Sequence, residues 1–279
     1  MASQQTQMSA KTTSDATSSH DPYVNDTELQ PALFDWLCRT GDSTLILSHR
    51  LSEWCGHGPA LEEDIALSNI ALDLIGHTQM WLGLAGEVEG QGRDADRLAY
   101  RRDAMQFRNL LLVELPGRDM AVTTMRQFLF DSYHHELLQR LVESASPRVA
   151  EIAAKAGKEV AYHVERAADL VIRLGDGSAE SHQRMQDALE LLWGYSGEMF
   201  VTDSVDESVA AAGVAPRPDA LHAAWQQRIE HVLDQATLAV PERNPNVHVG
   251  GRLGRHTEHL GYILAEMQFL QRAYPDASW

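Results

Sequence analysis

The stretch ALEEDIALSNIALDLIGHTQMWLGLAGE, residues 60–87, carries the clearest periodic pattern in the chain. Its apolar residues recur every three or four positions without strand-like alternation, which is the period of an α-helix. Two apolar stripes share this helix, so apolar surface covers most of its circumference and we expect it to be central. The first stripe comprises Leu67, Ile70, Leu74, His77, Trp81 and Leu84, and the second comprises Leu61, Ile65, Leu72, Ile75 and Leu82.

Helical periodicity continues on both sides of this segment, and Gly or Pro clusters separate the periodic stretches. Helices of roughly 25 residues are well above the average of about 11 or 12 and are typical of an up-and-down bundle. We therefore predict an all-α, ferritin-like long helical bundle with extra helices. The predicted helices cover 28–39, 42–55 (with Gly41-Asp42 as the break before it), 60–87, 95–113, 118–144, 147–174, 178–200, 217–238 and 256–273, and AVPERNPNVHVGGRLG (239–254) is expected to be irregular.

Composition divides the chain into a tail and one domain. Residues 1–25 are rich in Ser, Thr and Gln, which predicts a disordered N-terminal tail, and residues 26–279 form a single helical domain. The formal net charge of -17, from 23 Lys+Arg and 40 Asp+Glu, disfavours nucleic acid and anionic membranes as partners. With no apolar run near the roughly 20 residues of a membrane span and no signal-peptide pattern, we expect a cytoplasmic protein.

A ferritin-like bundle that binds two irons needs a Glu from each of two helices and a Glu-x-x-His pair from each of the other two. Residues three apart share a helix face, so the carboxylate bridges the metals while the imidazole binds one of them. No glutamate in this sequence has a histidine three positions later, and the nearest substitutes are Asp131 with His134 and Asp219 with His222. The sequence does not encode a carboxylate-rich dimetal centre, and we expect no catalytic, cofactor or metal ligand in this chain.

Two histidines are nevertheless placed on apolar stripes. His77 follows the stripe of residues 67–84, and His163 follows the stripe Ala156, Val160, Ala167, Leu170 and Leu174, so both should point inward. Three residues before them, where a di-iron protein carries Glu, stand Leu74 and Val160, which cannot coordinate a metal.

Acidic residues near these histidines leave two interpretations open. Asp73 and Glu159 lie four residues before the two histidines and are placed to hydrogen-bond them. We favour core histidines satisfied by neighbouring acids over a working metal site. The alternative is a metalloenzyme with a rebuilt centre made of Glu53, His77, Asp131, Glu159 and His163.

Several segments resemble the C subunits of bacterial phenylacetyl-CoA epoxidases, the ring-epoxidising multicomponent oxygenases of aerobic phenylacetate breakdown. Together these segments cover nearly everything after the tail. They are GDSTLILSHRLSEWCGHGPALEEDIALSNIALDLIGHTQ (41–79), FRNLLLVELP (107–116), DSYHHELLQRL (131–141), KEVAYHVERAADLVIRLGDG (158–177) and HTEHLGYILAEMQFLQRAYPDASW (256–279).

The resemblance implies a structural, non-catalytic component that keeps the catalytic, di-iron A subunit soluble and folded. It also implies further oxygenase subunits and a reductase as partners, with the di-iron cofactor in the catalytic partner and none in this chain. Comparison with the catalytic sibling's motifs places Leu74 and His77 on the first Glu-x-x-His pair and Val160 and His163 on the second. Glu53 and Asp131 are candidates for the two single-carboxylate positions. A helical interaction protein unrelated to oxygenases is the remaining alternative.

The stretch His256-Thr257-Glu258-His259 allows two interpretations, a surface metal clamp or the start of a helix. Thr257 directly precedes an apolar-periodic segment, which is the position of an N-cap. We therefore predict that Thr257 caps the last helix.

Overall fold

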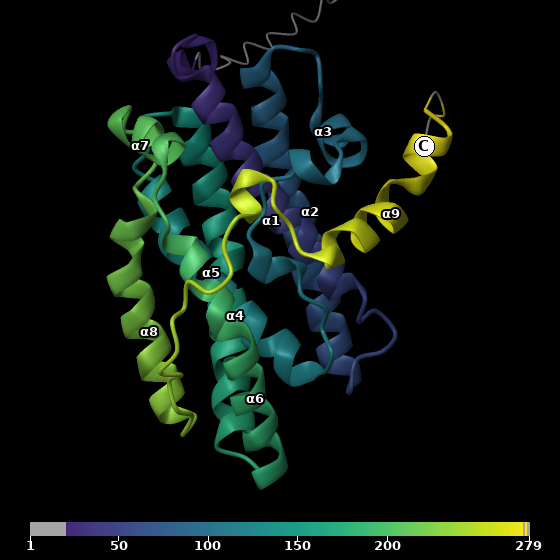
Figure 1. The fold of residues 1–279 in the computed structure, drawn as a ribbon, viewed down its shortest axis with the longest axis vertical. Helices are drawn as coiled ribbons and strands as arrows, with labels where there is room; N and C mark the ends of the chain where they lie inside the picture. Colours follow the sequence, from purple (N-terminus) through teal and green to yellow (C-terminus); the bar gives the residue numbers. More distant parts are fainter. Residues whose placement is uncertain (1–20, 276, 278–279) are drawn as a thin grey trace, which may run out of the picture.

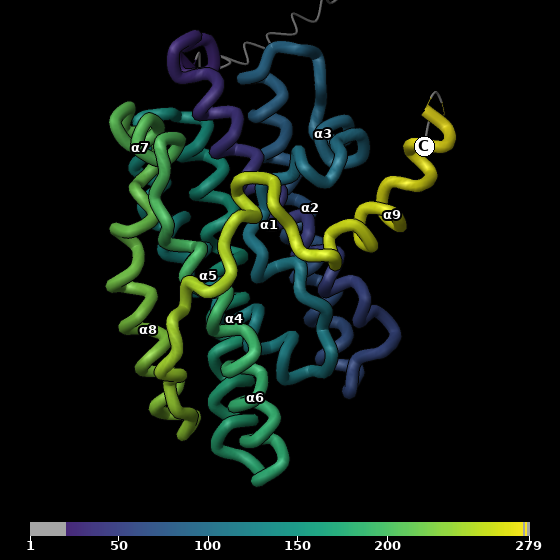
Figure 2. The backbone as a smooth tube through the Cα atoms, in the orientation of Figure 1, coloured from purple at the N-terminus to yellow at the C-terminus, as the bar shows by residue number. Residues whose placement is uncertain are grey.

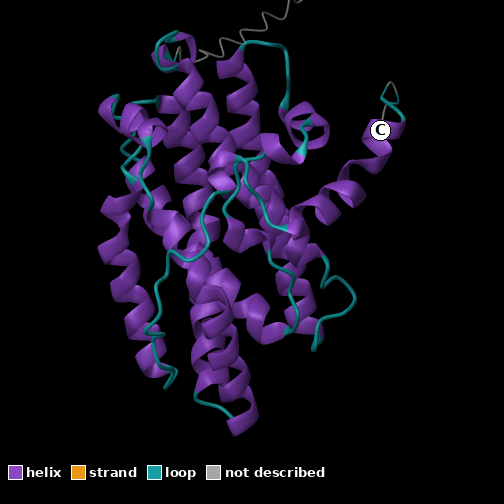
Figure 3. Cartoon of the chain, in the orientation of Figure 1, coloured by secondary structure: helices purple, strands orange, loops and turns teal. Residues whose placement is uncertain are grey.

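A computed structural model describes residues 21–275 and 277 of the chain. All regular structure in these residues is helical and none of it is a strand (Figure 3). The α-helices are α1 (Gln30–Ser52), α2 (Leu61–Glu89), α3 (Ala95–Arg101), α4 (Met120–Leu141), α5 (Pro147–Gly175), α6 (Ala179–Ser196), α7 (Ser204–Ala211), α8 (His222–Gln235) and α9 (Glu258–Ala273). Short 3-10 helices are η1 (Pro22–Asn25), η2 (Ala104–Gln106), η3 (Leu111–Glu114), η4 (Gly197–Phe200), η5 (Pro218–Leu221) and η6 (Gly251–Leu253).

The long helices α1, α2, α4 and α5 make the body of the molecule (Figure 1). Helix α1 packs along α2, and α4 packs along α5. Ion pairs join the start of α2 to the end of α5 (Glu63 to Arg166) and the end of α2 to the start of α5 (Glu87 to Arg148), so these two helices are antiparallel. A long crossover that contains α3 links the two hairpins. This is the ferritin-like arrangement that the long helices predicted, with extra helices around it.

The extra helices lie on different sides of the bundle. Helices α6 and α8 pack on α4 and α5, and α7 packs on α1. Helix α9 contacts α3 and η2 and stands away from the body as an arm (Figure 2). None of the helices in the described residues is long and apolar enough to cross a membrane.

The predicted break at Gly41-Asp42 is wrong, because α1 runs through it without interruption. A Cβ on Gly41 would lie 2.7 Å from Cδ2 of Leu82, so glycine lets α1 and α2 approach closely. Asp42 is fully buried, and its carboxylate binds the Arg102 guanidinium. Both residues therefore serve helix packing and do not end a helix.

The predicted helix over 95–113 is also wrong, because α3 ends at Arg101. Arg102 has an extended backbone, with φ -79 and ψ 144, and its buried side chain reaches Asp42. The backbone N–H of Arg108 donates to the same carboxylate at 2.8 Å. These contacts to α1 favour an extended path over helix continuation. Helix α7 was not predicted at all.

Helix α2 was predicted to be central because it carries two apolar stripes, but most of the second stripe is not buried. The first stripe is buried as predicted, and Leu82 of the second stripe is buried too. However, Leu61, Ile65 and Leu72 are 72, 52 and 65% exposed. One apolar face of α2 therefore packs into the bundle while the opposite face is bare.

The ends of the domain differ slightly from prediction. Residues 1–20 of the predicted tail lie outside the described residues, but Pro22–Asn25 already form η1, and Asp21 is buried against Ser146. The predicted N-cap is confirmed, since the Thr257 side chain accepts from the His259 N–H at the start of α9. The segment 239–250 is irregular, as predicted.

Candidate functional site

Three imidazoles meet in the core of the bundle. His77 of α2 and His163 of α5 are fully buried, and their ring centroids lie 6.4 Å apart. The sequence predicted both to point inward, which is confirmed. His134 of α4 joins them, with its ring centroid 5.9 Å from that of His77. The sequence identified His134 only with Asp131, as the nearest substitute for a Glu-x-x-His pair, and did not place it beside His77 and His163.

Each buried histidine is hydrogen-bonded by an acid from the opposite helix. His77 Nε2 lies 2.7 Å from Oε2 of Glu159, and His163 Nε2 lies 3.0 Å from Oδ2 of Asp73. The prediction named the right acids, but the pairs are exchanged between α2 and α5. Because these helices are antiparallel, the acid four residues before one histidine lies level with the other.

The position of these acids explains why they do not enter the core. Asp73 directly precedes Leu74, and Glu159 directly precedes Val160. A shift of one residue turns a side chain by roughly 100° about the helix axis. The carboxylates therefore lie at the outer edge of the seam between α2 and α5, where their side chains are 36 and 37% exposed.

The buried imidazoles are held neutral. Burial lowers the pKa of His77, although Glu159 opposes the shift, and burial lowers the pKa of His163 against the effect of Asp73. The pKa of His134 falls well below its ordinary range, chiefly through burial. A neutral ring that donates from Nε2 leaves a bare lone pair on Nδ1. In the described residues nothing hydrogen-bonds Nδ1 of His77, Nδ1 of His163 or either ring nitrogen of His134.

Asp131, a predicted single-carboxylate position, is also in the core of α4. It is fully buried, and burial raises its pKa to about 8 in spite of a 2.6 Å hydrogen bond donated by Gln127. Its other oxygen has no hydrogen-bond partner in the described residues. Asp131 is therefore a neutral acid at pH 7, and it does not hydrogen-bond His134.

Glu53 does not join this group, so its predicted place at the site is wrong. It is the C-cap of α1, its side chain is about half exposed, and it pairs with Arg50. Helix α1 has no acid between Asp42 and Glu53. Asp42 is already bound by Arg102, so α1 offers no carboxylate to the histidines.

These residues do not fit two iron ions. Leu74 and Val160, which the sequence comparison assigned to the positions of bridging carboxylates, are fully buried hydrocarbon side chains. Within residues 21–275, no three His, Cys, Asp or Glu side chains are grouped so that they could hold a metal ion. The donor set is three imidazoles and one protonated acid, which lacks the carboxylates that a di-iron centre needs.

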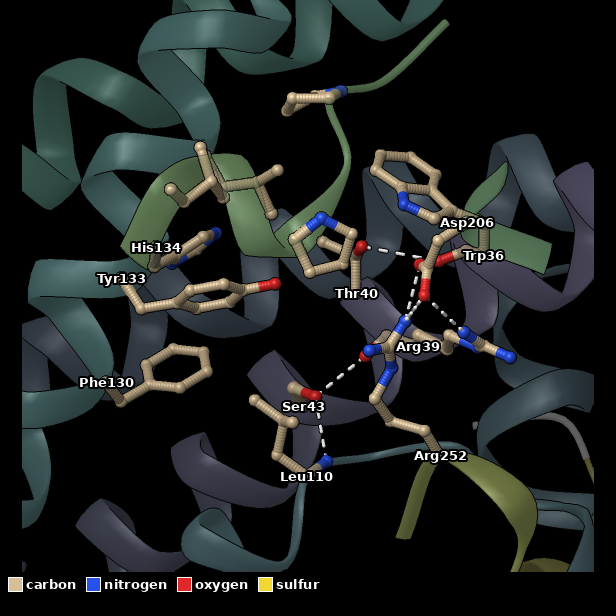
Figure 4. A pocket seen from close by; sticks show the side chains of 14 residues that line it. Trp36, Arg39, Thr40, Ser43, Leu110, Phe130, Tyr133, His134, Asp206 and Arg252 are labelled. Carbon is tan, nitrogen blue, oxygen red and sulfur yellow. Dashed lines mark hydrogen bonds and ion pairs between the residues drawn. The ribbon is translucent and has the colours of Figure 1, made fainter. Parts of the chain in front are cut away.

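A small cavity reaches His134 from the side of α7 (Figure 4). Trp36, Phe130 and Tyr133 line its apolar part. At its polar end Asp206 lies between Arg39 and Arg252 and binds both, so these cations are already neutralised. The cavity volume is about 30 Å³, which is room for about one water, whereas benzene needs a cavity of roughly 150 Å³. It cannot admit an aromatic ring in this form.

Comparison with known proteins agrees with the resemblance drawn from the sequence. Residues 15–279 match the family described as "Phenylacetic acid catabolic protein". The C subunit of the Escherichia coli (strain K12) 1,2-phenylacetyl-CoA epoxidase is 46% identical over 241 residues, which cover 86% of this chain and 96% of that relative. The chain therefore belongs to the phenylacetic acid catabolic protein family.

Proposed function

We propose that this chain is the non-catalytic C subunit of a phenylacetyl-CoA epoxidase in aerobic phenylacetate catabolism. In this role it binds no metal and stabilises a di-iron catalytic partner of the same fold. The similarity to the E. coli relative, which extends along most of both chains, supports the place in the epoxidase.

One observation carries the non-catalytic role. Leu74 and Val160, to which the sequence assigns the positions of two bridging glutamates, have fully buried hydrocarbon side chains. The nearest acids, Asp73 and Glu159, face outward and accept hydrogen bonds from the histidines. This arrangement uses the imidazoles to join α2 to α5 and leaves no carboxylate pair to bridge two metals.

A structural component influences its partner through mass action. A protein that binds only the folded form of its partner stabilises that form by about 2.7 kcal/mol when its free concentration is 100 times the Kd. Apolar surface that the catalytic partner cannot leave exposed is covered in the complex. Folding of the iron-loaded partner thereby depends on this chain.

Expression of the catalytic partner with and without this chain tests the stabilising role. We expect the catalytic partner alone to be poorly soluble or inactive, and we expect both properties to be restored when this chain is present. Full solubility and full activity of the catalytic partner on its own would contradict the proposal. The measurements are the soluble fraction and the epoxidation rate after addition of the reductase.

Metal analysis of the purified chain tests the alternative of a rebuilt metal centre. We expect iron and manganese far below one ion per chain after growth with both metals. Stoichiometric metal that is lost in the His77→Leu/His163→Leu variant would instead favour a metalloenzyme. Circular dichroism of the same variant separates metal loss from unfolding.

A further inference from the structure

The bare face of α2 consists of Leu61, Ile65, Leu72, Gly76 and Gly83, which we call the α2 stripe. The spacing between successive members is four, seven, four and seven residues, so they follow one side of the helix. The three large members are each more than half exposed. The three large members lie in the first half of this 29-residue helix, and exposed Asn69 and Gln79 flank the stripe. Single apolar residues are normal on a surface, but an apolar patch with a polar rim marks an interaction site.

The glycines of the α2 stripe have no role within the described chain. A Cβ on Gly76 or Gly83 would meet nothing within 4 Å, and neither residue has a positive φ. Glycine is among the least favourable residues in a helix interior, and these two are not needed for packing inside the chain. Small residues on an exposed helix face allow the backbone of another helix to approach closely.

The charged side chains beside the α2 stripe are of both signs, since exposed Glu62 and Glu151 lie there together with two exposed lysines. The lysines of the whole sequence are Lys11, Lys155 and Lys158, and the latter two are exposed on α5. Lys155 lies one turn before Glu159, the residue that contacts His77 of α2, so it is on the side of α5 that faces α2. The α5 arginines on this side are already bound by Glu87 and Glu63. By contrast, Lys155 and Lys158 form no ion pair with any residue that the structure describes.

We propose that the α2 stripe, with Lys155 and Lys158 beside it, is the surface that docks the di-iron sibling protein. This inference rests on the proposed function. The complementary surface is an apolar helix of the sibling that fits against Gly76 and Gly83 and carries carboxylates opposite the two lysines. Exposed Tyr162 of α5 lies on the same face as Lys155 and Lys158 and adds an aromatic side chain to the interface.

Two other occupants fit less well. Residues 1–20 contain no Leu, Ile, Val or aromatic residue, so the chain's own N-terminal segment cannot cover an apolar stripe. A second copy of this chain would bring the same two lysines into the interface again. It would also add repulsion between two chains that each carry a formal net charge of -17.

Competition for the sibling tests the docking surface. The sibling is co-expressed with wild-type chain and one variant chain that carry different tags, and the ratio of the two in the purified complex is measured. We expect Leu72→Arg and Gly76→Leu to be under-represented at least about tenfold, since one places a charge in the apolar contact and the other fills the close approach. Lys155→Glu/Lys158→Glu should be reduced several-fold, and more strongly at low salt.

Phe269→Arg is the matched control, because Phe269 of α9 is 65% exposed, the same fraction as Leu72. It should enter the complex as wild type does, and the melting temperatures of all isolated variants should stay close to wild type because the sites are exposed. Normal entry of Leu72→Arg and Gly76→Leu with exclusion of Phe269→Arg would overturn the proposal in favour of the α9 arm. A wild-type dimer in sedimentation that Leu72→Arg dissociates would overturn it in favour of a second copy. Absence of any complex between the sibling and the wild-type chain would contradict the proposed function as well. Equal entry of all variants into the complex would contradict only the proposed docking surface.

Discussion

The core histidines and Asp131 of this protein are kept neutral by burial. The three core imidazoles and the Asp131 carboxyl are almost completely buried, and burial lowers the pKa of the bases and raises that of the acid. A buried charge without a partner is costly, and the neutral forms avoid that cost. Neutral imidazoles and a protonated carboxyl are what a packed core tolerates, and a metal centre would need the opposite state of Asp131.

Asp131→Asn should stabilise the protein increasingly as pH rises. The folded pKa of about 8 lies above the unfolded value of 3.8, so the folded state holds a proton that the unfolded state releases. Wild-type stability therefore falls between about pH 4 and pH 8, while the amide has no such dependence. At about 1.4 kcal/mol for each pKa unit, the gain at pH 8 has an upper limit of several kcal/mol.

Urea unfolding of both proteins at pH 5 and pH 8 measures this difference. Asp169→Asn is the control, because Asp169 is an exposed α5 residue paired only with Arg173, and it should change stability little at either pH. An Asp131→Asn variant with the same advantage at both pH values would show that Asp131 is ionised in the folded state.

Among the helices, α2 illustrates how one sequence serves two kinds of contact. Its buried face packs on α1, where Gly41 admits Leu82, and its other face is the α2 stripe. One glycine lies in the contact between α1 and α2 and another lies on the outer face of α2, and the two occur there for different reasons. Gly41 is required by a close approach inside the chain, whereas the space around Gly83 is open.

Substitution of these two glycines should change stability in opposite directions. Gly41→Ala introduces a methyl 2.7 Å from buried Leu82 Cδ2, and this overpacking should cost about 1–3 kcal/mol. Gly83→Ala meets nothing and should stabilise the isolated chain by about 0.5–1 kcal/mol through helix propensity. Thermal unfolding of the isolated chain measures both effects. Equal shifts for the two variants would mean that α1 and α2 do not approach closely at Gly41.

Across the whole molecule, buried acids hold the C-terminal part to the bundle. Glu114 of η3 is fully buried and accepts from the Thr257 N–H at 2.8 Å and from the Thr257 hydroxyl at 2.5 Å. Glu198 of η4 accepts the N–H groups of Gly250 and Gly251, each at 2.7 Å. Helix α9 has few packing partners of its own, so these carboxylates fix where it leaves the body.

Glu114→Ala should loosen α9 without unfolding the bundle. The change leaves the part-buried donors at Thr257 and His256 without an acceptor, at a cost of up to about 1–3 kcal/mol for each. Hydrogen exchange should become faster in residues 256–273 and stay slow in α1 and α4. Glu143→Ala, which changes an exposed acid just after α4, is the control and should leave exchange of α9 unchanged. Protection of α9 equal to wild type would contradict the anchoring role of Glu114.

Local periodicity was enough to predict the long helices α2, α4 and α5 and the inward direction of His77 and His163. Those features depend on residues a few positions apart in one helix. That Leu74 and Val160 stand in place of ligand glutamates stays a prediction. Only the tertiary structure decided that α1 is uninterrupted, that α3 ends at Arg101, that the His–acid pairs are exchanged and that His134 lies beside His77. Asp42 and Arg102 are 60 residues apart in sequence, and His77 and Glu159 are 82 apart. Contacts at such separations leave no periodic trace, because they depend on how whole helices pack, and the same packing leaves one apolar face of α2 bare.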